Sequence, residues 1–179
     1  MSLEKTAEQI KNMEIRGAGK IAREAAAALR DHAESLPKAG LSAFVSEMNR
    51  AADILLATRP TAVSLPNAVH LTLAGLSSAE TESEARALVK TQADRFVDAS
   101  TKAVERIAEI CASRIADGMT IMTHCNSKAA LAGILLAKKQ GKNISVIATE
   151  VRPSLALWKA TAFWLTTATL ISTVLLQSP

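Results

Sequence analysis

Apolar residues recur every three or four positions through the first part of the chain. This spacing places them on one face of an α-helix and predicts helices over about residues 3–13, from a break at residues 16–19 to about residue 36, and over residues 41–57. Pro37 and Gly40 close the second helix, and Pro60 ends the third. The predicted buried face of the third helix consists of Phe44, Val45, Met48, Ala51, Ala52 and Leu55.

Two more helices are predicted before residue 118. Pro66 stands where a helix can begin without losing a hydrogen bond, which favours a short buried helix over residues 67–76. Thr81 and Glu84 have the spacing of a capping box and indicate the start of a long helix that ends at Gly118. Its predicted apolar stripe consists of Val89, Ala93, Phe96, Ala103, Ile107, Ile110 and Ile115.

The spacing of the apolar residues changes after Gly118. Residues 119–123 form a short apolar run, residues 128–139 have helical spacing with Gly141 as their stop, and residues 144–148 are a second β-branched run. A strand, a helix and a strand of these lengths predict a βαβ unit with parallel strands. The expected fold class is therefore α/β, with the start of a doubly wound sheet after a helical segment.

These elements divide the chain into three predicted segments: a helical domain over residues 1–117, a βαβ unit over residues 118–153 and an atypical tail over residues 154–179. Lys159 is the only charged residue of the tail, which also holds both tryptophans. The tail is open to three interpretations, namely a buried helix and strand, a membrane-associated segment, which we consider the least favoured, and a non-native end produced by truncation or a frameshift.

Composition narrows the function classes. Lys and Arg (21) exceed Asp and Glu (17) without basic blocks, and aromatic residues are 3% of the chain, so a small anionic ligand is favoured over nucleic acid. Two cysteines and the absence of a leader pattern predict a cytoplasmic protein without disulfides. The three histidines are scattered and no GxGxxG occurs, so we predict neither a metal nor a dinucleotide cofactor.

Two segments of the helical part carry candidate chemistry. Arg16, Gly17, Ala18 and Gly19 lie between two predicted helices, where glycine lets a ligand approach the backbone and the next helix directs its first N–H groups at an anion. Arg16 adds a forked donor for phosphate. A plain turn between helices explains the same residues, and Arg59 before Pro60 is equally typical of a solvated arginine at a helix end.

A third candidate follows the first predicted strand. Ligands of open α/β sheets bind beyond the carboxyl ends of the strands, where Cys125, Asn126 and Ser127 stand. Ser127 is a natural N-cap for the helix that begins at Lys128. A cysteine beside a helix N-terminus forms its thiolate more readily and serves as a base or nucleophile, although a buried, inert Cys125 fits the pattern too.

Four segments together carry a resemblance to a known family. They are Ile10–Ile15 with the following RGAG, RPTAVSLPNAV from Arg59, MTHCNSKA from Met122, and IATEVRP from Ile147. In order and spacing they resemble ribose 1,5-bisphosphate isomerases, the enzymatic branch of the initiation factor 2B α/β/δ family, over about residues 8–153. RGAG and the cysteine after the strand favour this branch over the non-catalytic regulatory subunits, which bind a sugar phosphate or a nucleotide.

The resemblance implies a helical N-terminal domain, a Rossmann-like domain and an active site between them. It implies conversion of α-D-ribose 1,5-bisphosphate to D-ribulose 1,5-bisphosphate in an archaeal route that salvages the ribose of nucleoside monophosphates. On the matching positions it implies that Arg16, Gly17, Ala18, Gly19 and Arg59 hold one part of the substrate. It further implies that Ser127, Lys128 and Ala129 bind a phosphate group and that Cys125 accepts the proton.

The family pattern also implies residues that are absent here. An aspartate proton donor is expected further along, yet no Asp or Glu follows Pro153. We therefore expect a chain that lacks the C-terminal half and whose activity is in doubt. Family members are hexamers that assemble through the Rossmann-like half, so we expect this chain not to form the hexamer.

Overall fold

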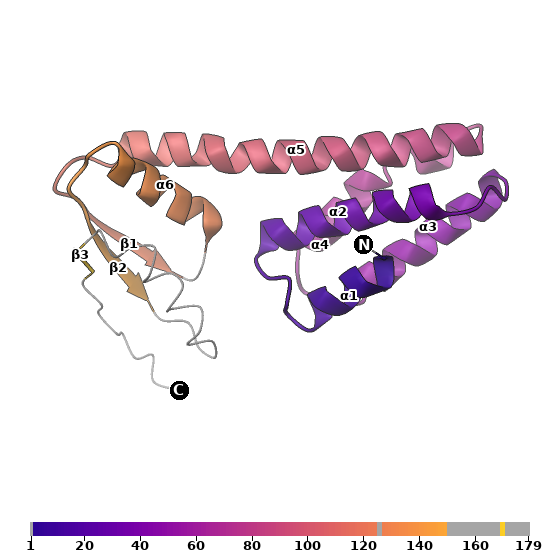
Figure 1. Cartoon of the computed structure of the whole chain (residues 1–179), viewed down its shortest axis with the longest axis horizontal. Coiled ribbons are helices and arrows are strands. Elements are labelled where there is room, and N and C mark those ends of the chain that lie inside the picture. The colour runs from indigo at the N-terminus through magenta and orange to yellow at the C-terminus, as the bar shows by residue number, and fades with distance from the viewer. Residues whose placement is uncertain (1, 125–126, 150–168, 171–179) are drawn as a thin grey trace. The chain divides into compact units, whose positions relative to one another are not determined.

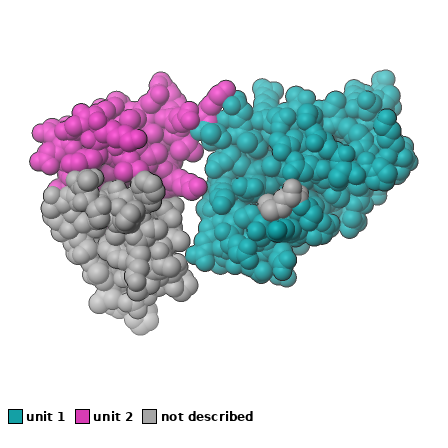
Figure 2. Space-filling model, in the orientation of Figure 1, with its two compact units in different colours: residues 1–101 teal, residues 102–179 magenta. Residues whose placement is uncertain are grey.

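The computed structural model describes residues 2–124, 127–149 and 169–170. The chain divides into two compact units, residues 1–101 and residues 102–179 (Figure 2). One long helix contributes residues to both, and each unit is described by itself below.

The first unit is helical, as the periodicity predicted. It contains α1 (Leu3–Lys11), α2 (Ala18–Ser35), α3 (Leu41–Leu56), α4 (Ser64–Thr72), the 3-10 turn η1 (Leu76–Ser78) and the start of α5 (Glu82–Arg114) (Figure 1). The helix α4 begins three residues earlier than predicted, so Pro66 is its third residue. Proline fits there because the first turn of a helix leaves its N–H groups without intrahelical acceptors.

The core of the first unit is built around α2, which packs against α1, α3 and α4 (Figure 1). Ala25 and Ala26 are fully buried on α2, and their small side chains let the neighbouring helices approach. Large apolar side chains such as Met48, Leu55 and Leu65 fill the remaining space. Five of the six residues predicted to face the core from α3 are buried, and Val45 is partly buried against it.

The long helix α5 starts with the predicted cap. The Thr81 hydroxyl accepts the Glu84 N–H at 3.2 Å, and the Glu84 carboxylate reaches back to the N–H of Glu80 at 2.9 Å. The carboxylate thus serves the residue before the N-cap instead of the N-cap itself.

The predicted single stripe along α5 is wrong in its second half. Ala85, Val89 and Ala93 are buried, but Ile107 and Ile110 are 47% and 43% exposed. Ala108 and Ala112, which are not on the predicted stripe, are buried instead, and Ile115 just after the helix is buried as predicted. Because an α-helix turns once in 3.6 residues, Ala108 and Ala112 lie on another face of α5 than Ala85, Val89 and Ala93. Each half of α5 therefore turns a different face to the core of its own unit.

The second unit contains the predicted βαβ arrangement. It consists of β1 (Thr120–His124), α6 (Lys128–Lys139), β2 (Ser145–Thr149) and the short β3 (Thr169–Leu170) (Figure 1). The strands are parallel in the order β1-β2-β3, with Met122 opposite Ile147 and Ser145 opposite Thr169. Ile134 and Ala137 of α6 share a core with Val146 of β2. This confirms an α/β chain with parallel strands.

Packing of α6 against α5 in the second unit depends on one glycine. A Cβ on Gly133 would lie 2.4 Å from Sγ of Cys111, a distance that no packed atom pair tolerates. The turn after α6 also closes the end of α5, because Lys142 Nζ donates to the carbonyls of Ala112 and Ile115 at 2.6 Å each. Gly141 has φ +86° after the last turn of α6 and is the predicted helix stop.

Most of the predicted tail, residues 154–179, lies outside the described residues, apart from the two residues of β3. Within the described part of the chain, no helix combines the length and the apolar character needed to cross a membrane.

Candidate functional site

The connection between α1 and α2 is held in one conformation by backbone contacts. The N–H groups of Glu14 and Ile15 both donate to the carbonyl of Gln9, at 2.9 and 3.0 Å. Met13 adopts φ +62°, which is uncommon for a residue other than glycine. Ile15 is 5% exposed and anchors the connection in the core. The four residues that follow, Arg16–Gly19, therefore start from a fixed position.

Arg16 and Gly17 shape the entry to α2. Nε of Arg16 donates to the carbonyl of Met13 at 2.5 Å, and the Arg16 side chain is exposed. Gly17 is the N-cap of α2 with φ +84° and ψ 128°. Nothing lies within 4 Å of a Cβ placed there, so the backbone conformation is the reason for glycine.

The N-terminus of α2 has the properties of an anion-binding end. The N–H of Ile21 is the first to donate inside the helix, to Gly17 at 2.9 Å, which leaves the N–H groups of Ala18 and Gly19 without an intrahelical acceptor. No side chain caps this end, and its first turn contains no acidic residue. Arg16 and the half-buried Lys20 add positive charge to the positive end of the helix dipole.

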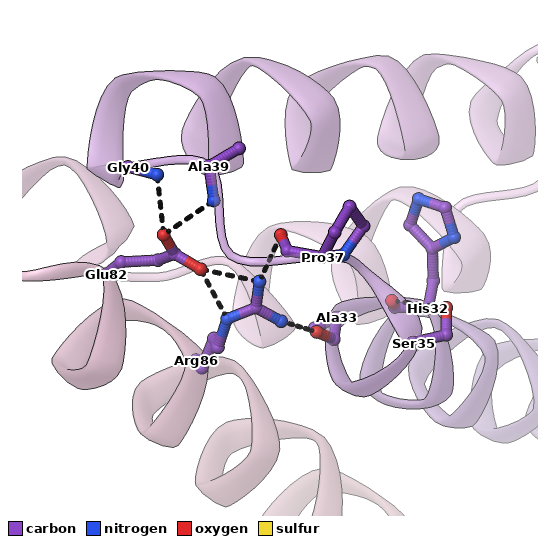
Figure 3. Close-up of polar contacts among 8 residues, drawn as sticks. All are labelled: His32, Ala33, Ser35, Pro37, Ala39, Gly40, Glu82 and Arg86. Atoms are coloured by element: carbon purple, nitrogen blue, oxygen red, sulfur yellow. Dashed lines mark hydrogen bonds and ion pairs between the residues drawn. The ribbon is translucent and has the colours of Figure 1, made fainter.

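The N-terminus of α3 begins in the same way but receives an anion from the protein itself. Its N-cap Gly40 has φ +91°, no cap through its own side chain and no acidic residue in the first turn. The carboxylate of Glu82 accepts the N–H groups of Gly40 and Ala39 at 2.7 and 3.2 Å (Figure 3). The two glycine-led helix ends of this unit thus differ in whether a carboxylate of the chain binds them.

Arg86 holds Glu82 in this position (Figure 3). Its guanidinium pairs with the Glu82 carboxylate at 2.6 Å, donates to the carbonyls of Ala33 and Pro37, and lies 4.6 Å from the ring centre of Phe44. The hydrogen bond from Arg86, followed by those from Gly40 and Ala39, lowers the pKa of Glu82 below its ordinary value. The arrangement is a clamp between α5 and the α2–α3 connection.

Arg59 lies three residues beyond the end of α3 and is half-buried. Its carbonyl accepts the N–H of Ala62 at 3.1 Å, so it stands in a turn between α3 and α4. No hydrogen bond or ion pair between described residues joins Arg59 to the Arg16–Gly19 turn. The structure therefore leaves the predicted shared role of these arginines untested.

The connection from β1 to α6 contains the remaining predicted residues. Ser127 is the N-cap of α6, as predicted, and its hydroxyl accepts the N–H of Ala130 at 3.4 Å. The first backbone bond inside the helix runs from Leu131 to Ser127, so the N–H groups of Lys128 and Ala129 lack intrahelical acceptors. The first turn contains no acidic residue, and Lys128 is exposed. This end too is suited to a phosphate group.

Cys125, the predicted proton acceptor, lies outside the described residues, as does Asn126. Its role stays a prediction. Among the residues that the structure describes, no three His, Cys, Asp or Glu side chains gather as ligands for a metal ion.

The sequence patterns did not point to Glu82 and Arg86. Their spacing of four on a helix is a common surface ion pair, and only the fold brings them to Gly40, 42 residues away from Glu82 in the chain. A signal was available in Gly40 itself, which heads a helix without any side chain that can cap it.

The described part is an α/β chain in which the N-termini of α2 and α6 lack acidic residues, an arrangement whose backbone N–H groups can bind an anion. The model of the Initiation factor 2 subunit family matches residues 14–178 of this chain, which therefore belongs to that family. The match continues past residue 153, where the sequence motifs ended, through nearly all of the tail.

Three known proteins illustrate the relationship. The chain is similar to the ribose 1,5-bisphosphate isomerases of Thermococcus kodakarensis (52% identity over 151 residues) and Methanocaldococcus jannaschii (47% over 151 residues). These alignments cover 82% and 84% of this chain but 47% and 48% of the relatives. Among solved structures, the δ subunit of translation initiation factor eIF-2B from A. fulgidus matches 96% of this chain and 54% of its own, with 28% identity and a TM-score of 0.72. The chain thus spans about half the length of the curated relatives that it matches.

Proposed function

We propose that this chain is part of a sugar-phosphate isomerase that converts α-D-ribose 1,5-bisphosphate to D-ribulose 1,5-bisphosphate. The observation that carries the proposal is the identity of about half of the aligned residues with two proteins of that name. The reaction belongs to the salvage of ribose from nucleoside monophosphates, and we place the protein in the cytoplasm. The full-length family forms hexamers, which we expect this chain by itself not to form.

The substrate explains the two helix ends that carry no acidic residue. A ribose bisphosphate brings several negative charges, which forked arginine donors and helix N–H groups bind better than a single lysine does. In the proposal, Arg16, Gly17, Ala18, Gly19 and Arg59 hold one part of the substrate. Ser127, Lys128 and Ala129 bind a phosphate group at the start of α6.

The chemistry requires one acid and one base. The phosphate ester on C1 prevents spontaneous ring opening, so an acid must protonate the ring oxygen while a base removes the proton from C2. We assign the base to Cys125, which precedes the start of α6 by three residues. We assign the acid to an aspartate in the half of the relatives that the alignments with this chain do not cover.

Alkylation of the two cysteines tests the assignment of the base. Iodoacetamide should modify Cys125 faster than Cys111, whose sulfur packs against Gly133, and ribose 1,5-bisphosphate should protect Cys125 alone. The experiment is run on this chain and on a version joined to the C-terminal half of the T. kodakarensis relative. Equal, slow rates that ignore the ligand in the joined version would remove the catalytic assignment.

Turnover in the joined version tests the function itself. Formation of ribulose 1,5-bisphosphate should stop with Cys125→Ser, while ligand binding is retained because the arginines and helix ends remain. Cys111→Ser is the matched control and should keep turnover. A joined version that binds ribose 1,5-bisphosphate but never converts it would contradict the proposal.

A second candidate is a regulatory subunit that senses a sugar phosphate or nucleotide without converting it. It is favoured by the structural likeness to an initiation factor subunit, which is lower in identity than the likeness to the isomerases. Capture of translation initiation factor 2 by this chain, together with absence of turnover in the joined version, would decide for this candidate.

A further inference from the structure

Glycine is needed at Gly19, the second glycine of the Arg16–Gly19 turn, for a different reason than at Gly17. Gly19 is the second residue of α2 and, unlike Gly17, does not have positive φ. A Cβ at Gly19 would lie 3.3 Å from Nη1 of Arg23, closer than most packed contacts. Glycine at this position therefore makes room for a guanidinium group.

The geometry of helical side chains explains how Arg23 arrives there. Residues four apart lie on one face, and long side chains lean towards the N-terminus of their helix. The Arg23 guanidinium consequently lies over the first turn of α2, although its Cα is one turn further along. Nη1 donates to the hydroxyl of Ser100 on α5 at 3.2 Å, which fixes the group from the opposite side within the first unit.

The charge of Arg23 is not balanced within the described part of the chain. Arg23 is half-buried, and no carboxylate of the described residues forms an ion pair with it. Arg30, two turns further along the same face of α2, pairs with both Asp31 and Asp94. A partly desolvated cation without a counter-charge is unfavourable by itself and becomes favourable when an anion binds nearby.

We propose that Arg23 is a positioning residue for a phosphate group bound at the start of α2. It keeps a fixed positive charge over the first turn in the space that the missing Cβ of Gly19 leaves, while Ser100 keeps the guanidinium in place. The inference rests on the proposed function for the identity of the whole ligand, but it concerns phosphate recognition alone.

The test is a titration of the ¹⁵N-labelled chain with inorganic phosphate, followed through the amide signals of Gly17 and Gly19. Arg23→Gln should weaken phosphate binding about fivefold, because it removes one charge close to the anion. Arg23→Lys should recover about half of that loss, and Ser100→Ala should weaken binding about twofold. Arg95→Gln removes an exposed arginine of the same unit and is the matched control, with no change expected.

A double-mutant cycle isolates the contact with Gly19. Gly19→Ala pushes the guanidinium away in the wild-type background, but in the Arg23→Gln background that crowding is relieved, so the two effects should not add. Additive effects, or an Arg23→Gln affinity equal to that of Arg95→Gln, would overturn the proposal. Far-UV circular dichroism checks that each variant is folded. If Arg23→Gln does not fold, Ser100→Ala, which removes the hydrogen bond to Arg23, tests the proposal in its place.

Ribose 1,5-bisphosphate as a second probe separates this inference from the proposed function. If the wild type binds it no more tightly than inorganic phosphate while Arg23→Gln weakens both, Arg23 keeps its role and the proposed substrate is wrong. If it binds tightly and Arg23→Gln has no effect on either probe, the substrate stands and the role of Arg23 is wrong. If inorganic phosphate leaves Gly17 and Gly19 unaffected in the wild type, the inference about Arg23 fails whatever the second probe does.

Discussion

The N-termini of α2 and α3 are built alike but differ in whether a carboxylate of the chain binds them. Both begin at a glycine with φ near +90°, and neither has a capping side chain of its own or an acidic residue in its first turn. At α3 the carboxylate of Glu82 accepts the N–H groups of Gly40 and Ala39, whereas the residues in and beside the first turns of α2 include Arg16, Lys20 and Arg23. Glu82 thus shows that backbone N–H groups just before a glycine-led helix bind a carboxylate.

The comparison teaches that a glycine-led helix start has two uses in this fold. When a carboxylate of the chain binds it, the start becomes part of the packing and joins distant segments, as Glu82 joins α5 to Gly40. Where no side chain caps the start and its first turn holds no acidic residue, as at α2, the N–H groups suit an anion from outside. The sequence around each glycine does not distinguish the two uses, but the fold does.

The largest effect should come from removing the cation that holds Glu82. Arg86→Met should lower the free energy of unfolding by about 3 kcal/mol, because two charged hydrogen bonds to the carbonyls of Ala33 and Pro37 and the contact with Phe44 are lost. Urea denaturation followed by circular dichroism measures the change. Lys90→Met breaks an exposed pair with Glu34 and serves as the control, with little effect expected. A similar loss for both variants would refute the role of the clamp.

Replacing the N-cap glycine by alanine should destabilise the protein equally at α2 and at α3. Gly17→Ala and Gly40→Ala should each lower the free energy of unfolding by about 2 kcal/mol, since both positions have positive φ with extended ψ, a region reserved for glycine. Only Gly17→Ala should also weaken binding of inorganic phosphate. Thermal unfolding and a phosphate titration on both variants provide the measurement, and a phosphate defect in Gly40→Ala would break the distinction.

A carboxylate introduced into the first turn of α2 should occupy its N-terminus, as Glu82 does at α3. Ala18→Glu, at the first residue of α2, should raise the free energy of unfolding by about 0.5 kcal/mol through the helix dipole. The same change should reduce affinity for inorganic phosphate about tenfold, because the added charge repels the ligand.

The matched change at α3 is Ala43→Glu, in the first turn of a helix whose N-cap N–H already donates to Glu82. It should lower stability slightly through repulsion between like charges and leave phosphate affinity unchanged. Calorimetric titration with phosphate and thermal unfolding of both variants give the comparison. Unchanged phosphate affinity in Ala18→Glu would show that the anion does not bind at α2.

The smallest effect is the pH dependence of the internal carboxylates. Arg86, then Gly40 and Ala39, lower the pKa of Glu82, and Arg50, with a smaller contribution from His32, lowers the pKa of Glu47 from 4.5 to about 2. A lowered folded-state pKa gives stability that is complete above pH 4.5 and is lost as pH falls towards 2. Glu82→Gln and Glu47→Gln should each flatten the fall in unfolding free energy between pH 5 and pH 2. An unaltered acid profile in both variants would contradict these assignments.

Local patterns predicted most of the fold. The helix limits followed from apolar spacing with glycine and proline stops, and the parallel strands followed from the change of period after Gly118. The exposed Ile107 and Ile110 were missed because one stripe was extended along α5, although each half of that helix faces a different core. The sequence pattern does not show where one core ends and the next begins.

The sequence predicted only those parts of the candidate site that depend on residues close together in the chain. Ser127 was identified as a cap because an N-cap depends on the next three residues, and the structure confirms it. Glu82 and Arg86 were missed because their partners lie 42 to 53 residues away, beyond any periodic signal. The roles of Arg16, Arg59 and Cys125 rest on resemblance and stay predictions.

The contacts of Lys142 have a consequence for the order in which the chain folds during synthesis. Arg86 and Glu82 bind residues that precede them, so this clamp can close as soon as α5 has begun to emerge from the ribosome. The carbonyls of Ala112 and Ile115, at and just after the end of α5, receive their donor instead from Lys142, which is translated 27 to 30 residues later. We therefore expect the first unit to fold during synthesis, while the end of α5 stays frayed until α6 has been made.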